Sequence, residues 1–292
     1  MIKKIIAALL MSVTTAAVMA MPLGSMSVLV VEDGTGKILL EKNANAVVPI
    51  ASLTKLMTAM VVLDAKPDMD APISIDKIDV DMLKHSTSRV PVGATISRRD
   101  VLQLALMSSD NRAAASLART YAGGPTAFAA AMSAKIKALG MTQTVLEEPT
   151  GLSPNNKSTA ADLIKMATAA ARYPDITRIT TDPKDMIRIN GRQVEYHNTN
   201  RLVGAKGWDI GLSKTGYTQE AGRCLIMRIK SAGTNATLIL LNAKANSARV
   251  LDALNIRRFI AGGEGEPMVA MASTRHKRRT IHLASRHRRA AL

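Results

Sequence analysis

Aromatic residues and cysteine are scarce in this chain. Aromatic side chains make up 2% of its 292 residues, and the single cysteine is Cys224. The shortage of aromatics leaves little material for stacking nucleic-acid bases, and one cysteine excludes an intramolecular disulfide. Cys224 alternates with apolar residues in a strand-like pattern, so we expect it in the core and not as a nucleophile. With 47% hydrophobic and 21% charged residues, the composition is globular, with a mostly aliphatic and methionine core.

Several catalytic motifs are also missing. The chain contains neither the G-x-S-x-G turn of α/β-hydrolases nor the G-x-x-x-x-G-K-[ST] phosphate loop. Only two of the five histidines, His85 and His197, precede the basic C-terminal segment, so a histidine-based triad has few candidates. The other three lie among positive charges that oppose a bound cation. We therefore expect no metal and no other cofactor.

The formal net charge of +16 is unevenly distributed. Two of these charges lie in residues 1–20 and seven, with no acid among them, in residues 273–292, which leaves +7 for residues 21–272. The basic character therefore belongs largely to the two ends. We expect a Gly-rich linker and a disordered basic tail over 263–292. Within it, residues 275–289 either associate with an anionic envelope surface or remain solvated.

The first twenty residues have the pattern of a secretory signal peptide. Lys3 and Lys4 give a positive start, a mostly apolar stretch follows over 5–18, and Ala20 supplies the small residue of a cleavage site. We expect cleavage after Ala20 and export to the periplasm, with an uncleaved anchor as the alternative. Export also argues against nucleic acid as a partner.

Strand patterns occur near both ends of the chain, and helix patterns lie between them. Two strands flank the turn at 33–36, a helix with an apolar face covers 52–64, and residues 98–175 are mainly helical. Two more strands and a closing helix follow at 221–230, 235–242 and 245–261. We expect an α/β (α+β) domain over 21–262, in which one sheet is built from both chain ends and the helical block is an insertion.

Three short motifs together indicate serine chemistry. They are Ser52-Leu53-Thr54-Lys55 (S-x-x-K), Ser109-Asp110-Asn111 (S-x-N) and Lys214-Thr215-Gly216 (K-T-G). The first two types are common by chance, and the chain contains decoys at 74–77 and 153–155. Context separates the motifs from the decoys. Ser52 begins a helix with an apolar face, the second motif lies in a break between helices, and K-T-G follows a short strand expected at 208–213.

The spacing of the first motif suits an activated serine. A serine hydroxyl becomes a useful nucleophile when a base takes its proton, and residues three apart share a helix face, so Lys55 reaches Ser52. Burial and a second cation, Lys214, would lower the pKa of Lys55. The amides of Ser52 and Tyr217 would form an oxyanion hole. Taken singly, Ser52 is better explained as a helix cap and Lys55 as a solvated charge, whereas the ordered trio favours catalysis.

The other two motifs supply a relay and substrate contacts. We expect Ser109 to pass a proton to a leaving nitrogen. Asn111 would hold either Lys55 or a substrate amide. The segment Lys214-Thr215-Gly216 would bind substrate, with its lysine and threonine on a carboxylate.

The motifs and their surroundings resemble the serine D-Ala-D-Ala peptidases, or low-molecular-mass penicillin-binding proteins, and within them the D-alanyl-D-alanine endopeptidase branch. The resemblance covers roughly residues 25–260. The matching stretches are PIASLTKLMTAMVVLDA (49–65), LALMSSDNRAAASLA (104–118), EPTGLSPNNKSTAADL (148–163) and GLSKTGYTQEAGRCLIMR (211–228).

The resemblance implies a β-lactamase/transpeptidase-like fold, in which helices flank an antiparallel sheet and a helical subdomain is inserted. It implies Ser52 as the acyl acceptor, Lys55 as the base, and Ser109 and Asn111 as the second motif. The implied substrates are peptidoglycan peptides, cleaved after D-Ala through an acyl-enzyme, and β-lactams are implied as inhibitors. Carboxypeptidase relatives usually append a β-rich domain and an amphipathic anchor. This chain ends soon after Ala261, so we expect a soluble or peripherally held enzyme.

Three alternatives to an endopeptidase stay open. The first is a DD-carboxypeptidase that removes terminal D-Ala, since the motifs do not separate the two activities. The second is a class A β-lactamase, but such enzymes deacylate with a glutamate in E-x-x-L-N, a pattern that Glu147 and Glu148 do not reproduce, so we expect slow turnover of β-lactams. The third is a non-catalytic cell-wall-binding module, against which three intact motifs argue.

Overall fold

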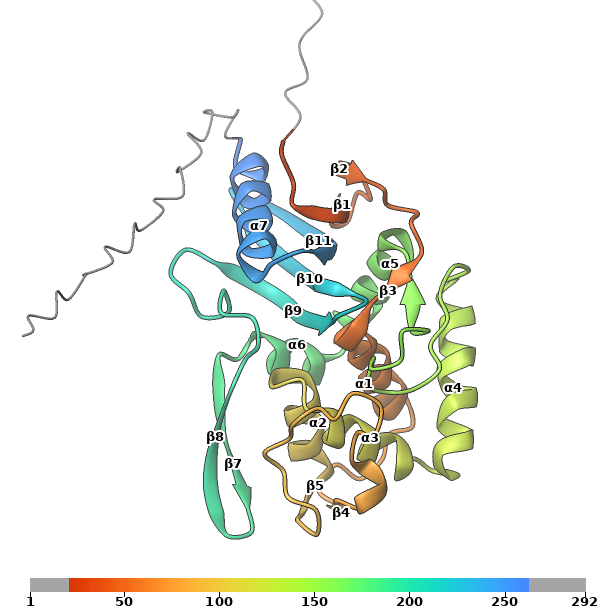
Figure 1. Cartoon of the computed structure of the whole chain (residues 1–292). Coiled ribbons are helices and arrows are strands. Elements are labelled where there is room, and N and C mark those ends of the chain that lie inside the picture. The colour runs from red at the N-terminus through yellow and green to blue at the C-terminus, as the bar shows by residue number, and fades with distance from the viewer. Residues whose placement is uncertain (1–20, 263–292) are drawn as a thin grey trace, which may run out of the picture.

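A five-stranded antiparallel sheet in the order β2-β1-β11-β10-β9 forms one layer of the computed structural model, which describes residues 21–262 (Figure 1). Both chain ends contribute to it, as predicted. Its strands are β1 (Ser25–Glu32), β2 (Ile38–Lys42), β9 (Asp209–Thr218), β10 (Gly222–Ser231) and β11 (Thr234–Ala243). The leader predicted over 1–20 and the tail predicted over 263–292, with its envelope contact at 275–289, lie outside the described residues.

Helices cover both faces of this sheet. The closing helix α7 (Asn246–Ile260) packs on one face and α5 (Ala160–Ala170) on the other. Val28 of β1 belongs to the apolar cluster beneath α7, whereas its neighbour Leu29 belongs to the larger cluster that includes α5. Successive side chains of a strand point to opposite faces, so a sheet covered on both faces needs apolar residues at consecutive positions. The arrangement confirms the predicted fold class.

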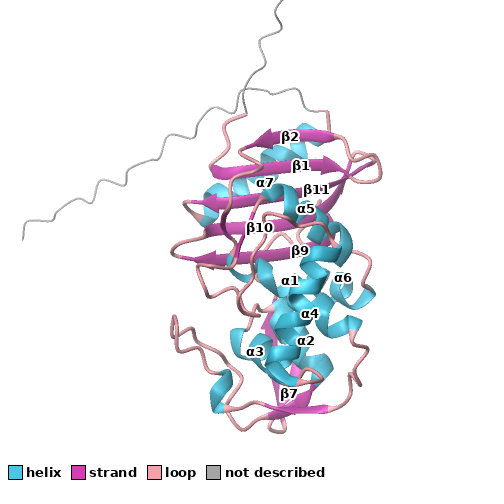
Figure 2. Cartoon of the chain, turned by 90° about the vertical axis from the view of Figure 1, so that its right-hand side faces the viewer, coloured by secondary structure: helices cyan, strands magenta, loops and turns pink. Residues whose placement is uncertain are grey.

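A mainly helical region makes up the other half of the structure in space and lies below the sheet in Figure 2. Its helices are α1 (Thr54–Asp64), α2 (Arg98–Met107), α3 (Asn111–Arg119), α4 (Gly124–Ala138) and α6 (Pro174–Thr181). Every α1 residue from Thr54 to Val62 is buried, because this helix contacts α2, α3, α4, α5 and α6. The start of α1 is therefore enclosed by other elements. Among residues 21–262, no helix is both long and apolar enough to cross a membrane.

Short strands and turns complete the chain. The two-stranded pairs are β3 (Val48–Pro49) with β6 (Lys157–Ser158), β4 (Pro72–Ser74) with β5 (Thr95–Ser97), and β7 (Lys184–Ile189) with β8 (Arg192–His197). Two 3₁₀ turns cover Ala51–Leu53 and Lys77–Asp79. The β7–β8 hairpin and α6 were not predicted. In the hairpin only Ile187, Ile189 and Tyr196 are buried, which is too little apolar periodicity to indicate strands.

The strand expected at 208–213 is longer than predicted. It is β9, which continues to Thr218, so K-T-G lies within the strand and does not follow it. The partner strand β10 explains the extra length, because it pairs with β9 as far as Gly222 opposite Thr218. Cys224 on β10 is buried in the larger core, as predicted, and burial raises the pKa of its thiol to about 11.

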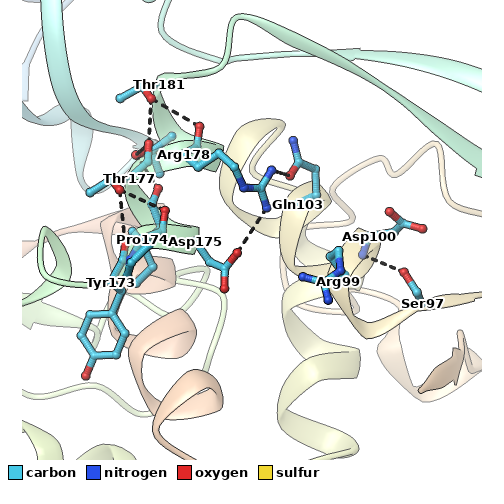
Figure 3. A network of polar contacts seen from close by, with 12 residues as sticks. Ser97, Arg99, Asp100, Gln103, Tyr173, Pro174, Asp175, Thr177, Arg178 and Thr181 are labelled. Carbon is cyan, nitrogen blue, oxygen red and sulfur yellow. Dashed lines mark hydrogen bonds and ion pairs between the residues drawn. The ribbon is translucent and has the colours of Figure 1, made fainter. Parts of the chain in front are cut away.

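A polar network ties α6 to α2 (Figure 3). The Arg178 guanidinium donates to Gln103 Oε1 at 3.5 Å and to Asp175 Oδ1 at 3.3 Å. At the start of α2, the Ser97 hydroxyl oxygen accepts a hydrogen bond from the amide of Asp100 and so caps the helix. Because α6 contacts both α2 and β9, this network helps to place the sheet edge against the helices.

Candidate active site

Ser52 and Lys55 lie where a 3₁₀ turn runs into α1. The turn spans Ala51–Leu53 and α1 begins at Thr54, so Ser52 precedes the helix and its hydroxyl does not cap it. Ala51 has a φ of +49°, a conformation that is costly for a non-glycine residue and is common at functional sites. Lys55 Nζ lies 3.0 Å from Ser52 Oγ, the contact predicted from their spacing.

All three ammonium donors of Lys55 have acceptors. Beyond Ser52, Nζ donates to Asn111 Oδ1 at 2.6 Å and to the Thr150 carbonyl at 2.7 Å. The Asn111 Nδ2 group donates to Ser86 Oγ, which keeps Oδ1 facing Lys55. Both carbonyl oxygens only accept. After loss of one proton, the amine would keep its two N–H bonds to these carbonyls, and its lone pair would face the Ser52 hydroxyl.

Burial lowers the pKa of Lys55 from 10.5 to about 8. The carboxylates of Glu148, Asp110 and Asp81 oppose this shift, in that order. The predicted effect of Lys214 on the pKa of Lys55 is not among the causes of this shift. The repulsion acts on Lys214 instead, since burial first and then the charge of Lys55 hold the Lys214 pKa well below 10.5. The lowered pKa therefore gives Lys55 a neutral, proton-accepting form near pH 8, where an ordinary lysine is almost fully protonated.

The break between α2 and α3 brings the second motif against β9. Ser109 has a φ of +59°, and its hydroxyl accepts a hydrogen bond from Lys214 Nζ at 2.9 Å. Asp110 caps α3 by accepting the amide of Ala113, so Asn111 begins that helix. Consequently this one turn contacts both lysines, Lys55 through Asn111 and Lys214 through Ser109.

The third motif passes close to the start of α1. A Cβ on Gly216 would lie 2.9 Å from the Ile50 carbonyl oxygen and 3.1 Å from the Ser52 amide, so only glycine fits without a shift. The Thr215 side chain is buried, whereas the Tyr217 side chain is 54% exposed. The pairing of the Ser52 and Tyr217 amides as an oxyanion hole stays a prediction.

A turn at 148–151 completes the site, although the sequence patterns gave it no catalytic role. Its Thr150 carbonyl is the third acceptor of Lys55. Glu148 was considered only as a β-lactamase-type water activator, but hydrogen bonds from its own turn occupy its carboxylate. The available signal was the matching stretch 148–163. No group of three or more His, Cys, Asp or Glu side chains within residues 21–262 is placed to hold a metal ion.

Comparison with known proteins points to one family. A family model described as D-alanyl-D-alanine carboxypeptidase matches residues 13–245, which include all three motifs. The D-alanyl-D-alanine endopeptidase of Pseudomonas aeruginosa is 46% identical over 252 residues, covering 86% of this chain and 81% of that protein. The enzyme of the same name from Escherichia coli is 42% identical over 265 residues, covering 90% and 86%. The crystal structure of the Streptomyces K15 DD-transpeptidase superposes with a TM-score of 0.76 at 25% identity, covering 82% of this chain and 97% of that one.

Proposed function

Since the chain belongs to the S11 family of D-alanyl-D-alanine peptidases and is a serine hydrolase of that family, we propose that it is a DD-endopeptidase that cleaves D-Ala cross-links in peptidoglycan. The proposal rests mainly on the contacts of the Lys55 amine, which lies within hydrogen-bond distance of Ser52, Asn111 and the Thr150 carbonyl at once. The two endopeptidase relatives support the choice of bond. The family description favours DD-carboxypeptidase activity as the second candidate.

In the proposed acylation step, neutral Lys55 takes the hydroxyl proton of Ser52 while Oγ bonds to the D-Ala carbonyl carbon. The carbonyl electron pair moves onto oxygen, where the amides of Ser52 and Tyr217 stabilise the charge. When the tetrahedral intermediate collapses, its C–N bond breaks and the nitrogen takes a proton from Ser109. Lys214, whose Nζ lies 2.9 Å from Ser109 Oγ, returns a proton to that hydroxyl.

Hydrolysis then releases the acylated fragment. A water oxygen bonds to the acyl carbon while one water proton passes through Ser109 to Lys214, which replaces the proton that Lys214 gave up during acylation. The bond from the acyl carbon to Ser52 Oγ then breaks, and Oγ takes back the proton held by Lys55. The product ends in a D-Ala carboxylate. Because Glu148 is held by its own turn, we expect no fast water activation of the class A type, and β-lactams should remain attached to Ser52.

The edge of the sheet offers a place for the peptide. Since β9 is the last strand in the order, its outer edge pairs with no further strand within residues 21–262. An extended peptide can add to such an edge through main-chain hydrogen bonds. K-T-G lies on this strand, so a peptide aligned with it would pass Ser52. Lys214 and Thr215 would then bind a substrate carboxylate.

We place the enzyme in the periplasm, because the proposed substrate is peptidoglycan and residues 1–20 have the pattern of a signal peptide. The basic segment 275–289, which carries all seven positive charges of residues 273–292, would add electrostatic association with an anionic envelope surface.

Digestion of purified sacculi tests the proposed bond choice. Chromatography of the released muropeptides should show cross-linked dimers converted to monomers by the wild-type enzyme, and no conversion by Ser52→Ala. Conversion of pentapeptides to tetrapeptides with dimers intact would replace the endopeptidase assignment by the carboxypeptidase one. Equal cleavage by Ser52→Ala would contradict both.

A further inference from the structure

The turn at 148–151 is fixed to α1 through three consecutive carbonyl oxygens. Each of the carbonyls of residues 148, 149 and 150 accepts a side-chain donor, in order Asn156 Nδ2 (2.9 Å), Thr58 Oγ1 (2.7 Å) and Lys55 Nζ (2.7 Å). Thr58 and Lys55 are three residues apart and so share one face of α1. Asn156 also donates to Thr54 Oγ1 at 3.1 Å. The turn therefore lies along the helix face that presents the Lys55 amine.

The Glu148 side chain stabilises the same turn by accepting hydrogen bonds from the residues that follow it. One carboxylate oxygen accepts the amide and the hydroxyl of Thr150, at 2.7 and 2.5 Å. The other accepts the amides of Gly151 and Ser153, at 2.6 and 3.3 Å. Four donors converge on one side chain, whose two carboxylate oxygens offer about four lone-pair sites for them. The position of the Thr150 carbonyl, and through it one N–H of Lys55, depends on this carboxylate.

Charges from four elements surround the Lys55 amine. Glu148 comes from the turn, Asp110 from the start of α3, Asp81 from the loop before β5, and Lys214 from β9. Among the carboxylates, Glu148 has the largest effect in favour of the ammonium. The same side chain thus combines a geometric link to Lys55 with the strongest stabilisation of its charge.

We propose that Glu148 is a positioning residue for Lys55. Its carboxylate fixes the Thr150 carbonyl that directs the Lys55 lone pair toward Ser52, and its charge sets the pH range in which that amine is neutral. The inference rests on the proposed function, in which Lys55 is the base. It gives Glu148 a part in forming the acyl-enzyme, unlike a glutamate that activates water for deacylation.

The test is the pH profile of acylation by a fluorescent penicillin, measured on the full chain between pH 5.5 and 9.5. Acylation should rise as Lys55 loses its proton, with a midpoint near its pKa of about 8. In Glu148→Gln the lost charge no longer stabilises the ammonium, so the midpoint should move down by about 0.5–1 pH unit. The plateau should fall about tenfold, because the Thr150 carbonyl is less well held.

Two further variants separate charge from position. Glu148→Asp keeps the charge on a shorter side chain, so the midpoint should stay and the plateau should fall. Glu147→Gln is the matched control. Its carboxylate binds Ser153 Oγ and Asn155 Nδ2 and is not among the charges that act on Lys55, so both quantities should match the wild type.

An unchanged midpoint in Glu148→Gln, or an equal shift in Glu147→Gln, would overturn the proposal. If Glu148→Gln does not fold by circular dichroism, Glu148→Asp decides: a lower plateau supports the role and an unchanged plateau contradicts it. Failure of the proposed function looks different, because the wild type would then not be acylated, or would be labelled at a residue other than Ser52.

Discussion

Replacing Lys55 by methionine should slow acylation of Ser52 by a penicillin about 10²–10⁴-fold at pH 8, the effect expected from losing a positioned general base. Methionine has similar length but cannot accept the Ser52 proton, and it leaves Asn111 Oδ1 and the Thr150 carbonyl without their donor. The rate would be measured from the time course of fluorescent labelling. The residual rate should also lose its rise near pH 8.

The decoy motif provides the control for this variant. Lys77 follows Ser74 at the same spacing, but it is exposed and lies in a 3₁₀ turn after β4. Lys77→Met should leave the acylation rate unchanged. A Lys55→Met enzyme that folds normally and retains acylation within about threefold of the wild type would rule out Lys55 as the base, since a positioned base contributes far more.

Gly151→Ala should damage both stability and acylation. Gly151 has a φ of +85°, and an added Cβ would lie 2.0 Å from the Ala51 carbonyl oxygen and 2.8 Å from the Ser52 amide. Strain and overpacking together should lower the free energy of unfolding by about 3 kcal/mol or more. A shifted Ser52 should slow acylation about 100-fold. Urea unfolding and penicillin labelling of the same preparation measure the two effects.

Gly140→Ala is the matched control for the clash. Gly140 also has a left-handed φ, +64°, but no atom lies within 4 Å of an added Cβ. This variant should show only the backbone cost, about 1 kcal/mol, and normal acylation. Equal behaviour of the two glycine variants would mean that the turn at 148–151 does not press on the nucleophile.

The parts of the site that follow from local pattern were predictable. Ser52 and Lys55 are three residues apart, and the spacing alone predicted the contact that is observed at 3.0 Å. A break between two helices indicated where Ser109 and Asn111 would lie. Asn111 contacts Lys55 across 56 residues of sequence, and Ser109 contacts Lys214 across 105. Only the order of the three motifs suggested these contacts.

The turn that completes the site was not predictable in the same way. The contact from Lys55 to the Thr150 carbonyl joins residues 95 apart and uses a backbone atom, which every residue type possesses. The role of Glu148 depends in turn on that contact. The fold shows the same limit. Strands with strong apolar patterns were predicted, whereas the β7–β8 hairpin was missed and β9 was predicted too short. Hydrogen bonding to a partner strand, and not the local apolar pattern, determines where these strands form and end.

The site of penicillin attachment shows whether Ser52 is the acylated nucleophile. The wild type, Ser52→Ala and Ser74→Ala would be incubated with a fluorescent penicillin, digested, and mapped by mass spectrometry. We expect stable label on the peptide that contains Ser52, equal labelling of Ser74→Ala, and none in Ser52→Ala. Label on another serine, or undiminished labelling of Ser52→Ala, would contradict this role of Ser52.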